Sequence, residues 1–201
     1  MKPSPERSAF NTLLQSLADA FASEGRPGGD QAVAALRAAR SQPYRRTASQ
    51  ADLGPLLNTA CDLAGALPFS QSIAHCSTLL DWTLWEGTGL DPSVSARLFS
   101  TELVGPDGHI AADGVRIGLL VSEPSTDYPV SSHSGEETYL VLAGTAEWIV
   151  GDQDYVACPP GTLIHHPAWV PHGRRTLDEP FLGAWRWSGD LDLSTFRVAE
   201  D

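Results

Sequence analysis

The sequence predicts an α+β fold that is mainly β, with α-helices at the N-terminus and an antiparallel β-barrel after them. Apolar residues recur at helical spacing through about the first 90 residues, whereas short segments rich in β-branched and aromatic residues follow from residue 96 onward. The 201 residues, 42% of them hydrophobic, suffice for one well-packed domain. We therefore expect a single domain over residues 1–201, in which a helical segment at 1–90 packs on a barrel at 96–198.

Glycines and prolines divide the helical part. Apolar residues at helical spacing from Phe10 to Phe21 predict a helix over residues 8–22, which the Gly- and Pro-rich run at 25–29 ends. Further helices are expected over 30–40, with Asp30 as N-cap, over 52–67 before Pro68, and, as a fourth candidate, over 73–85.

The barrel part consists of short apolar segments that Gly, Pro and Asp separate. Several such strands in succession favour a sandwich or barrel, and the helices can close one end or one edge of it. The expected strands cover residues 97–104, 115–122, 138–142, 146–150 and 181–187.

Charge and cysteine content exclude several classes of protein. The net charge is -12, and basic residues pair only at Arg45–Arg46 and Arg174–Arg175, so the basic surface that nucleic acid requires is missing. No secretion signal and no run of about 18 apolar residues is visible. The three cysteines lack CxxC spacing, which favours a reducing compartment. We expect a cytoplasmic monomer or homodimer without nucleic-acid or membrane partners.

The main functional candidate is the set His133, Glu137, Tyr139 and His172. Residues two apart on a strand share a face, so Glu137 and Tyr139 should project together into the barrel, and His133 lies just before that strand. A carboxylate buried there needs a partner, and a divalent cation is the natural one. Two imidazoles and a carboxylate suit Zn²⁺, Fe²⁺ or Mn²⁺ and leave coordination positions open for a substrate. The alternative is a metal-free, hydrogen-bonded polar cluster.

The motifs around these residues resemble those of the cupin superfamily. The first cupin motif has a histidine, a glutamate and, six residues later, a glycine, which His133, Glu137 and Gly144 match. The histidine of the second motif corresponds to His172. The resemblance implies a cupin β-barrel, a double-stranded antiparallel jelly roll.

Two positions depart from the usual cupin pattern. Ser131 stands where cupins commonly have another histidine. Trp169 stands where the usual motif has a glycine, two residues after the position equivalent to Pro167. The first departure removes a usual metal ligand. Tyr139, two residues beyond Glu137, can replace it.

With Tyr128 and the N-terminal helices, the pattern resembles one cupin branch, the dimethylsulfoniopropionate (DMSP) lyases of the DddQ type. The resemblance implies that His133, Glu137, Tyr139 and His172 hold the metal, and that Tyr139 and Tyr128 act as base or handle the substrate. It also implies a carbon–sulfur lyase that eliminates dimethyl sulfide from DMSP and leaves acrylate.

The chemistry of DMSP is compatible with this set of residues. A metal-bound carboxylate acidifies the proton on the adjacent carbon, and proximity to a dication stabilises the phenolate of Tyr139. Aromatic faces attract the sulfonium by roughly 0.5 to 2 kcal/mol per contact. The candidates for that contact are Trp169, Trp185, Trp187 and Tyr155.

Other interpretations remain open on the sequence alone. The cupin fold also hosts dioxygenases, isomerases and non-catalytic proteins that bind a small ligand. His165 and His166 should face opposite sides of a strand, so one of them can approach the metal, although such residues more often line a pocket. For His75 and His109, which lie outside the motifs, we expect no special role.

Overall fold

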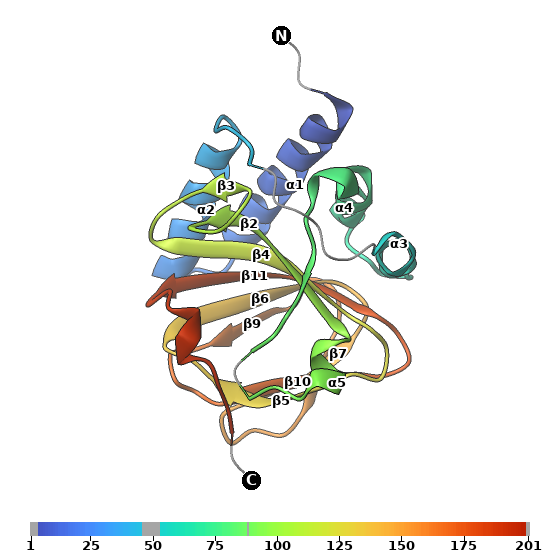
Figure 1. The fold of residues 1–201 in the computed structure, drawn as a ribbon, viewed down its shortest axis with the longest axis vertical. Coiled ribbons are helices and arrows are strands. Elements are labelled where there is room, and N and C mark those ends of the chain that lie inside the picture. Colours follow the sequence, from blue (N-terminus) through green and yellow to red (C-terminus); the bar gives the residue numbers. More distant parts are fainter. Residues whose placement is uncertain (1–3, 46–52, 88, 200–201) are drawn as a thin grey trace.

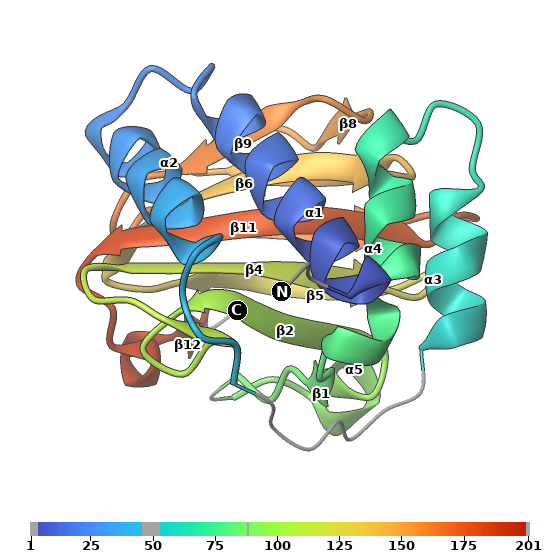
Figure 2. The ribbon, with the colours of Figure 1, turned by 90° about the horizontal axis from the view of Figure 1, so that it is seen from above.

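The computed structural model describes residues 4–45, 53–87 and 89–199. Two sheets, antiparallel except for the parallel pair of β2 and β3, face each other, and the N-terminal helices cover the outer face of the larger sheet (Figures 1 and 2). The predicted α+β, mainly β fold is confirmed. The larger sheet has the order β1-β2-β4-β11-β6-β9 with β3 beside β2, and the smaller has the order β12-β5-β10-β7-β8.

The strand boundaries agree with the five predicted strands and add others. The strands are β1 (Thr83–Leu84), β2 (Leu98–Gly105), β3 (Ile110–Ala111), β4 (Val115–Ser122), β5 (Asp127–Ser132), β6 (Gly135–Ala143), β7 (Ala146–Val150), β8 (Val156–Cys158), β9 (Leu163–His166), β10 (His172–Thr176), β11 (Phe181–Gly189) and β12 (Arg197–Val198).

The helices are short after the first two. They are α1 (Pro5–Phe21), α2 (Pro27–Ala39), α3 (Gly54–Cys61), α4 (Gln71–His75) and α5 (Pro92–Ser95), with 3₁₀ turns at Pro68–Ser70, Ser77–Leu79 and Leu193–Thr195. None of the described helices is long and apolar enough to cross a membrane.

The predicted helix over 8–22 is present as α1, which begins slightly earlier. Ser4 caps it, because its hydroxyl accepts a hydrogen bond from the backbone N–H of Arg7 at 3.2 Å, and Pro5 occupies the first turn. The apolar face, including Phe10 and Leu17, is fully buried against the sheet. The apolar residues whose spacing predicted the helix thus form the buried face of α1.

The boundaries of the next two helices differ from the prediction. α2 begins at Pro27 instead of Asp30, because Gly28 and Gly29 form its buried first turn and do not break the chain. α3 ends at Cys61 and does not continue to Pro68, since Gly65 adopts a φ of +91° that a helix cannot accommodate. Its expected start at Asp52 lies outside the described residues.

The predicted fourth helix over 73–85 is wrong. Only the short helix α4 and a 3₁₀ turn occupy its first part, and the chain is then extended as β1. Thr83 and Leu84 pair with Ser100 and Phe99 of β2, so sheet pairing prevails over the helical periodicity. The extended path places Trp85 beside the interior of the barrel.

The larger sheet is covered on both faces. On β4, Leu119 packs against the helices and Leu120 packs between the two sheets. All residues of β4 are buried, which explains why its sequence is a nearly continuous apolar run. The space between the sheets holds the aromatic residues around the site described below.

A buried ionic cluster joins the helical layer to β11. Arg186 is fully buried, and its guanidinium forms ion pairs with Glu24, before α2, and with Glu136 of β6 at 2.9 Å. Its Nη1 also donates to the hydroxyl of Ser188 at 3.0 Å. The guanidinium lies so close to Gly28 that a Cβ at that position would collide with it.

We expect Arg186→Met to lower the free energy of unfolding by about 3–5 kcal/mol, because it leaves Glu24 buried without its cation. Urea unfolding followed by circular dichroism measures this change. The matched control is Arg37→Met, which removes an exposed pair with Asp19 and should cost below about 1 kcal/mol. Equal effects of the two substitutions would contradict the proposed importance of the buried cluster.

Candidate metal centre

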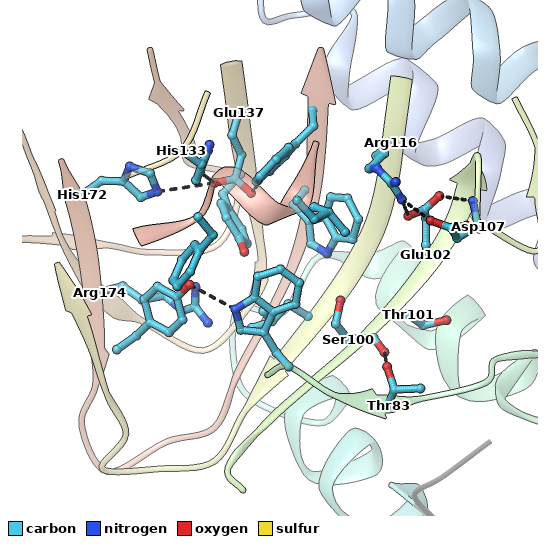
Figure 3. A pocket seen from close by; sticks show the side chains of 18 of the residues that line it. Thr83, Ser100, Thr101, Glu102, Asp107, Arg116, His133, Glu137, His172 and Arg174 are labelled. Carbon is cyan, nitrogen blue, oxygen red and sulfur yellow. Dashed lines mark hydrogen bonds and ion pairs between the residues drawn. The ribbon is translucent and has the colours of Figure 1, made fainter. Parts of the chain in front are cut away.

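A cavity of about 300 Å³ lies between the two sheets. His133, Glu137 and His172 line one side of it, and the ion-paired Arg116 lies on the other (Figure 3). Both strands and loops contribute, since Glu137 belongs to β6, His172 begins β10, and His133 precedes β6. Gly144 ends β6 with a φ of +73° at a point where a Cβ would collide with the backbone of Pro180.

The three residues form a compact donor set. One ligand atom from each of His133, Glu137 and His172 can be chosen so that all lie within 4.8 Å of one another. The Nε2 atoms of His133 and His172 lie 3.4 Å and 3.7 Å from Oε2 of Glu137. All three side chains are buried.

The backbone orients both imidazoles. Nδ1 of His133 lies 2.9 Å from the carbonyl oxygen of Gly135, and Nδ1 of His172 lies 2.9 Å from that of Val170. Because a carbonyl only accepts, each Nδ1 carries the proton and each Nε2 directs a lone pair toward Glu137. Nε2 of His133 is buried without a hydrogen-bond partner. An unpartnered nitrogen lone pair beside a carboxylate fits a divalent cation.

The electrostatic environment favours the metal-binding protonation states. Burial and, to a smaller extent, the neighbouring His166 lower the pKa of His172 to about 3. Burial raises the pKa of Glu137, but the neighbouring His133 and His166 outweigh this effect and hold the pKa well below its usual range. At neutral pH the site therefore presents a neutral imidazole at His172 and an ionised carboxylate.

The two candidate tyrosines line the same cavity. Tyr139 is buried on β6, with its ring centroid 4.9 Å from that of Trp148. Burial raises the pKa of Tyr139 well above its ordinary value, Glu137 raises it further, and Arg174 opposes the shift. Tyr128, on β5, accepts a hydrogen bond from Nε1 of Trp85 at 3.1 Å. The structure thus brings both tyrosines to the cavity that contains the candidate donor set.

Burial also raises the pKa of Tyr128, to about 12, although Arg174 opposes the shift. Neither phenol therefore ionises at neutral pH by virtue of the protein surroundings alone. Stabilisation of a phenolate there requires additional positive charge.

Of the four predicted aromatic contacts for a sulfonium, two line the cavity. These are Trp185 and Trp187 of β11. The ring of Trp187 stacks on His133 at a centroid distance of 4.1 Å, and its Nε1 donates to Oε1 of Glu137 at 2.7 Å. Trp187 therefore positions two of the candidate ligands as well as forming the cavity wall.

The other two predicted aromatic residues are not brought to the cavity. Trp169 is 56% exposed and has a φ of +63°, so its turn directs the ring outward. The ring of Tyr155 packs under the guanidinium of Arg175, 4.3 Å from its carbon, and does not line the cavity. Neighbouring side chains on a strand point to opposite faces, and Arg175 is exposed whereas Arg174 is buried in the cavity wall.

Several cavity residues escaped the sequence analysis. They include Trp85, Trp148, Arg174, Phe196 and also His109, for which no role was expected. Trp85 was not predicted because a helix was expected at its position. Trp148 was not predicted because it projects from β7, and no local sequence pattern reveals how β7 aligns with the other strands. Strand alternation alone indicates that Arg174 shares a face with His172, so that signal was available.

Of the adjacent histidines His165 and His166, one of which strand alternation allows to approach the metal, His166 lies beside the donor set. It is fully buried, its Nδ1 lies 3.0 Å from Oε2 of Glu137, and its ring stacks on that of His172 at 3.9 Å. β9 pairs with β6 so that His166 is opposite Glu137, whereas His165 points to the other face and approaches Thr138. Of the two adjacent histidines, the interior one is therefore His166.

The fold and the donor set define a cupin-type barrel with a candidate metal centre. The chain belongs to the dimethylsulfoniopropionate lyase family, whose model matches residues 30–183. The predicted family and fold are confirmed.

Two curated relatives and two solved structures are similar to the chain. It is 32% identical over 114 residues to DMSP lyase DddQ of Ruegeria pomeroyi, a match covering 56% of this chain and 57% of the relative. It is 34% identical over 139 residues to the putative DMSP lyase DddL of Cereibacter sphaeroides, covering 66% of this chain and 57% of the relative. The matches thus span little more than half of each curated relative.

The solved structures show the shared fold. One, described as belonging to the DMSP lyases RdDddP and RnDddQII, has a TM-score of 0.72 at 23% identity and covers 97% of this chain and 100% of its own. The other, DddQ from Ruegeria pomeroyi, has a TM-score of 0.72 at 23% identity and covers 95% of this chain and 96% of its own. Both therefore include the N-terminal helices as well as the barrel.

Proposed function

We propose that the protein is a metal-dependent carbon–sulfur lyase that cleaves DMSP by β-elimination into dimethyl sulfide and acrylate. The observation that carries this proposal is the donor set His133, Glu137 and His172 in the wall of a cavity that Tyr139 also lines. Membership of the DMSP lyase family supports the choice of substrate.

His133, Glu137 and His172 would hold the metal, and the resemblance adds Tyr139 as a fourth ligand. A bound divalent cation would supply Lewis acidity that stabilises negative charge on the substrate and on a nearby phenolate. The nitrogen and oxygen donors suit Zn²⁺, Fe²⁺ or Mn²⁺. Metal analysis of protein purified without chelators identifies the ion.

In the proposed reaction Tyr139 removes a proton from the carbon next to the substrate's carboxylate. The electrons of that C–H bond form the new C=C bond of acrylate, and the C–S bond electrons leave with sulfur as neutral dimethyl sulfide. Trp185 and Trp187 offer aromatic faces to the sulfonium cation. Tyr128, which also lines the cavity, is the second candidate for the base.

We further propose that the protein works in the cytoplasm, as a monomer or homodimer. The described cysteines Cys61, Cys76 and Cys158 are all free and buried, which is compatible with a reducing compartment. Its partner would be one small molecule, a sulfonium carboxylate.

We expect metal-loaded protein to release dimethyl sulfide from DMSP in stoichiometric amount with acrylate. Gas chromatography of the headspace measures the sulfide, and liquid chromatography measures acrylate in the same vial. Heat-killed protein provides the background. Release no faster than that background, at any of the three metals, would show that the substrate assignment is wrong.

A further inference from the structure

Arg174 is a buried cation without a carboxylate partner among the described residues. It is 3% exposed and lines the cavity. Within the chain, its Nη2 donates to the hydroxyl of Ser122 at 3.2 Å, and the guanidinium also hydrogen-bonds the side chain of Tyr139. A guanidinium carries five N–H donors, so most of its hydrogen-bonding capacity is available to something in the cavity.

The other two buried arginines in the described part of the chain, Arg116 and Arg186, have acidic partners. Arg116, also in the cavity wall, pairs with Glu102 at 2.6 Å and with Asp107 at 2.8 Å. Arg175, the next residue along β10, pairs with Glu147 at 2.6 Å on the exposed face. A buried charge is expensive unless it is paired, which makes the unpaired Arg174 the exception that calls for an anionic ligand.

Aromatic rings surround the guanidinium of Arg174 and keep water away from it. Its central carbon lies 4.7 Å from the ring centroid of Tyr128, 5.4 Å from that of Tyr139, and 5.5 Å from those of Trp148 and Phe181. Contacts with ring faces stabilise a cation but leave most of its directional donors unused. In a site of low polarity, an anion that accepts hydrogen bonds from two of these N–H groups is held strongly.

The position of Arg174 relates it directly to the proposed chemistry. It shares a face of β10 with His172, two residues away, and Figure 3 shows both on the side of the cavity that holds His133 and Glu137. Its guanidinium also contacts the two tyrosines proposed as base. A carboxylate bound there therefore has its adjacent carbon near a tyrosine.

We infer that Arg174 binds the carboxylate of the substrate, which the metal would also hold, and thereby orients it, an inference that rests on the proposed function. The sulfonium end then points away from this cation, toward Trp185 and Trp187. The preferred substrates are accordingly short carboxylates with a cationic leaving group. Sulfonium compounds that lack a carboxylate lose this contact, and Arg174 repels them.

The test is binding of propionate, which carries the carboxylate but no leaving group. Fluorescence of the tryptophans that line the cavity reports binding without any turnover. We expect Arg174→Gln to weaken propionate binding at least about 10-fold, because it removes a charge-assisted, bidentate contact. The matched control Arg175→Gln alters the adjacent, exposed arginine and should leave propionate binding within about 2-fold of the parent.

Trimethylsulfonium separates a lost carboxylate contact from a damaged cavity. Arg174→Gln should bind this cation at least as well as the parent, and a parallel loss of both ligands would overturn the inference. Arg174→Lys, which retains the positive charge but not the two parallel N–H donors of a guanidinium, should recover part of the propionate affinity. If Arg174→Gln does not fold, Arg174→Lys decides: propionate affinity equal to that of the parent overturns the inference.

The result is distinguishable from failure of the proposed lyase activity. Propionate binding that depends on Arg174 in a protein that releases no dimethyl sulfide would retain the carboxylate site and discard the DMSP reaction. Conversely, turnover of DMSP with equal propionate binding in the parent and in Arg174→Gln would retain the reaction and discard the role of Arg174.

Discussion

Replacement of Tyr139 by Phe should lower the rate of dimethyl sulfide release by about two to four orders of magnitude, the range typical of a lost general base. The phenyl ring keeps the packing against Trp148, so the fold should be retained. His133, Glu137 and His172 remain in place, so the variant should also retain most of its metal.

Turnover of Tyr139→Phe is measured together with its metal content and its thermal unfolding. Tyr155→Phe is the matched control, because it removes a tyrosine hydroxyl that lies outside the cavity. Near-normal activity of Tyr139→Phe would remove this residue from the role of base. Tyr128→Phe would then be examined as the remaining tyrosine of the cavity.

His172→Ala should abolish metal binding and turnover together. The substitution removes one of the two imidazoles and leaves Glu137 with His133 as the remaining members of the donor set. With Tyr139 as the proposed fourth ligand, the substitution leaves three ligands in place of four and only one imidazole, so metal should be lost during dialysis.

Elemental analysis after dialysis, with the activity of the same sample, tests this expectation. His75→Ala is the control, because His75 is exposed at the end of α4. Full activity of His172→Ala in a sample without metal would contradict the metal-dependent mechanism as a whole.

The parts of the fold that follow from local pattern were predictable. α1 follows from its apolar periodicity, and β4 follows from its apolar, β-branched run. β5 and β10 escaped because Pro129, Ser131 and two arginines give them a polar composition, although Ser131 and Arg174 are buried and Arg174 lines the cavity. Sequence patterns assume that the inner face of a strand is apolar, and a functional cavity violates that assumption.

The candidate site likewise contains residues that a local pattern predicts and contacts that it does not predict. Alternation along one strand places Glu137 and Tyr139 on a common face, and both residues line the cavity. The contact between Glu137 and His166 depends on the pairing of β6 with β9, which is a long-range property. Residues that meet across strands therefore become visible only when the register is known.

The pairing of Arg186 with Glu24 limits how far the chain can be shortened. β11 carries Arg186 toward the helices and Trp185 and Trp187 toward the cavity. A barrel fragment beginning near residue 90 would lack Glu24 and would expose the apolar surface that α1 and α2 cover. Anyone seeking a minimal catalytic unit should therefore retain the helices, or else redesign Arg186 and the outer face of the sheet in the same step.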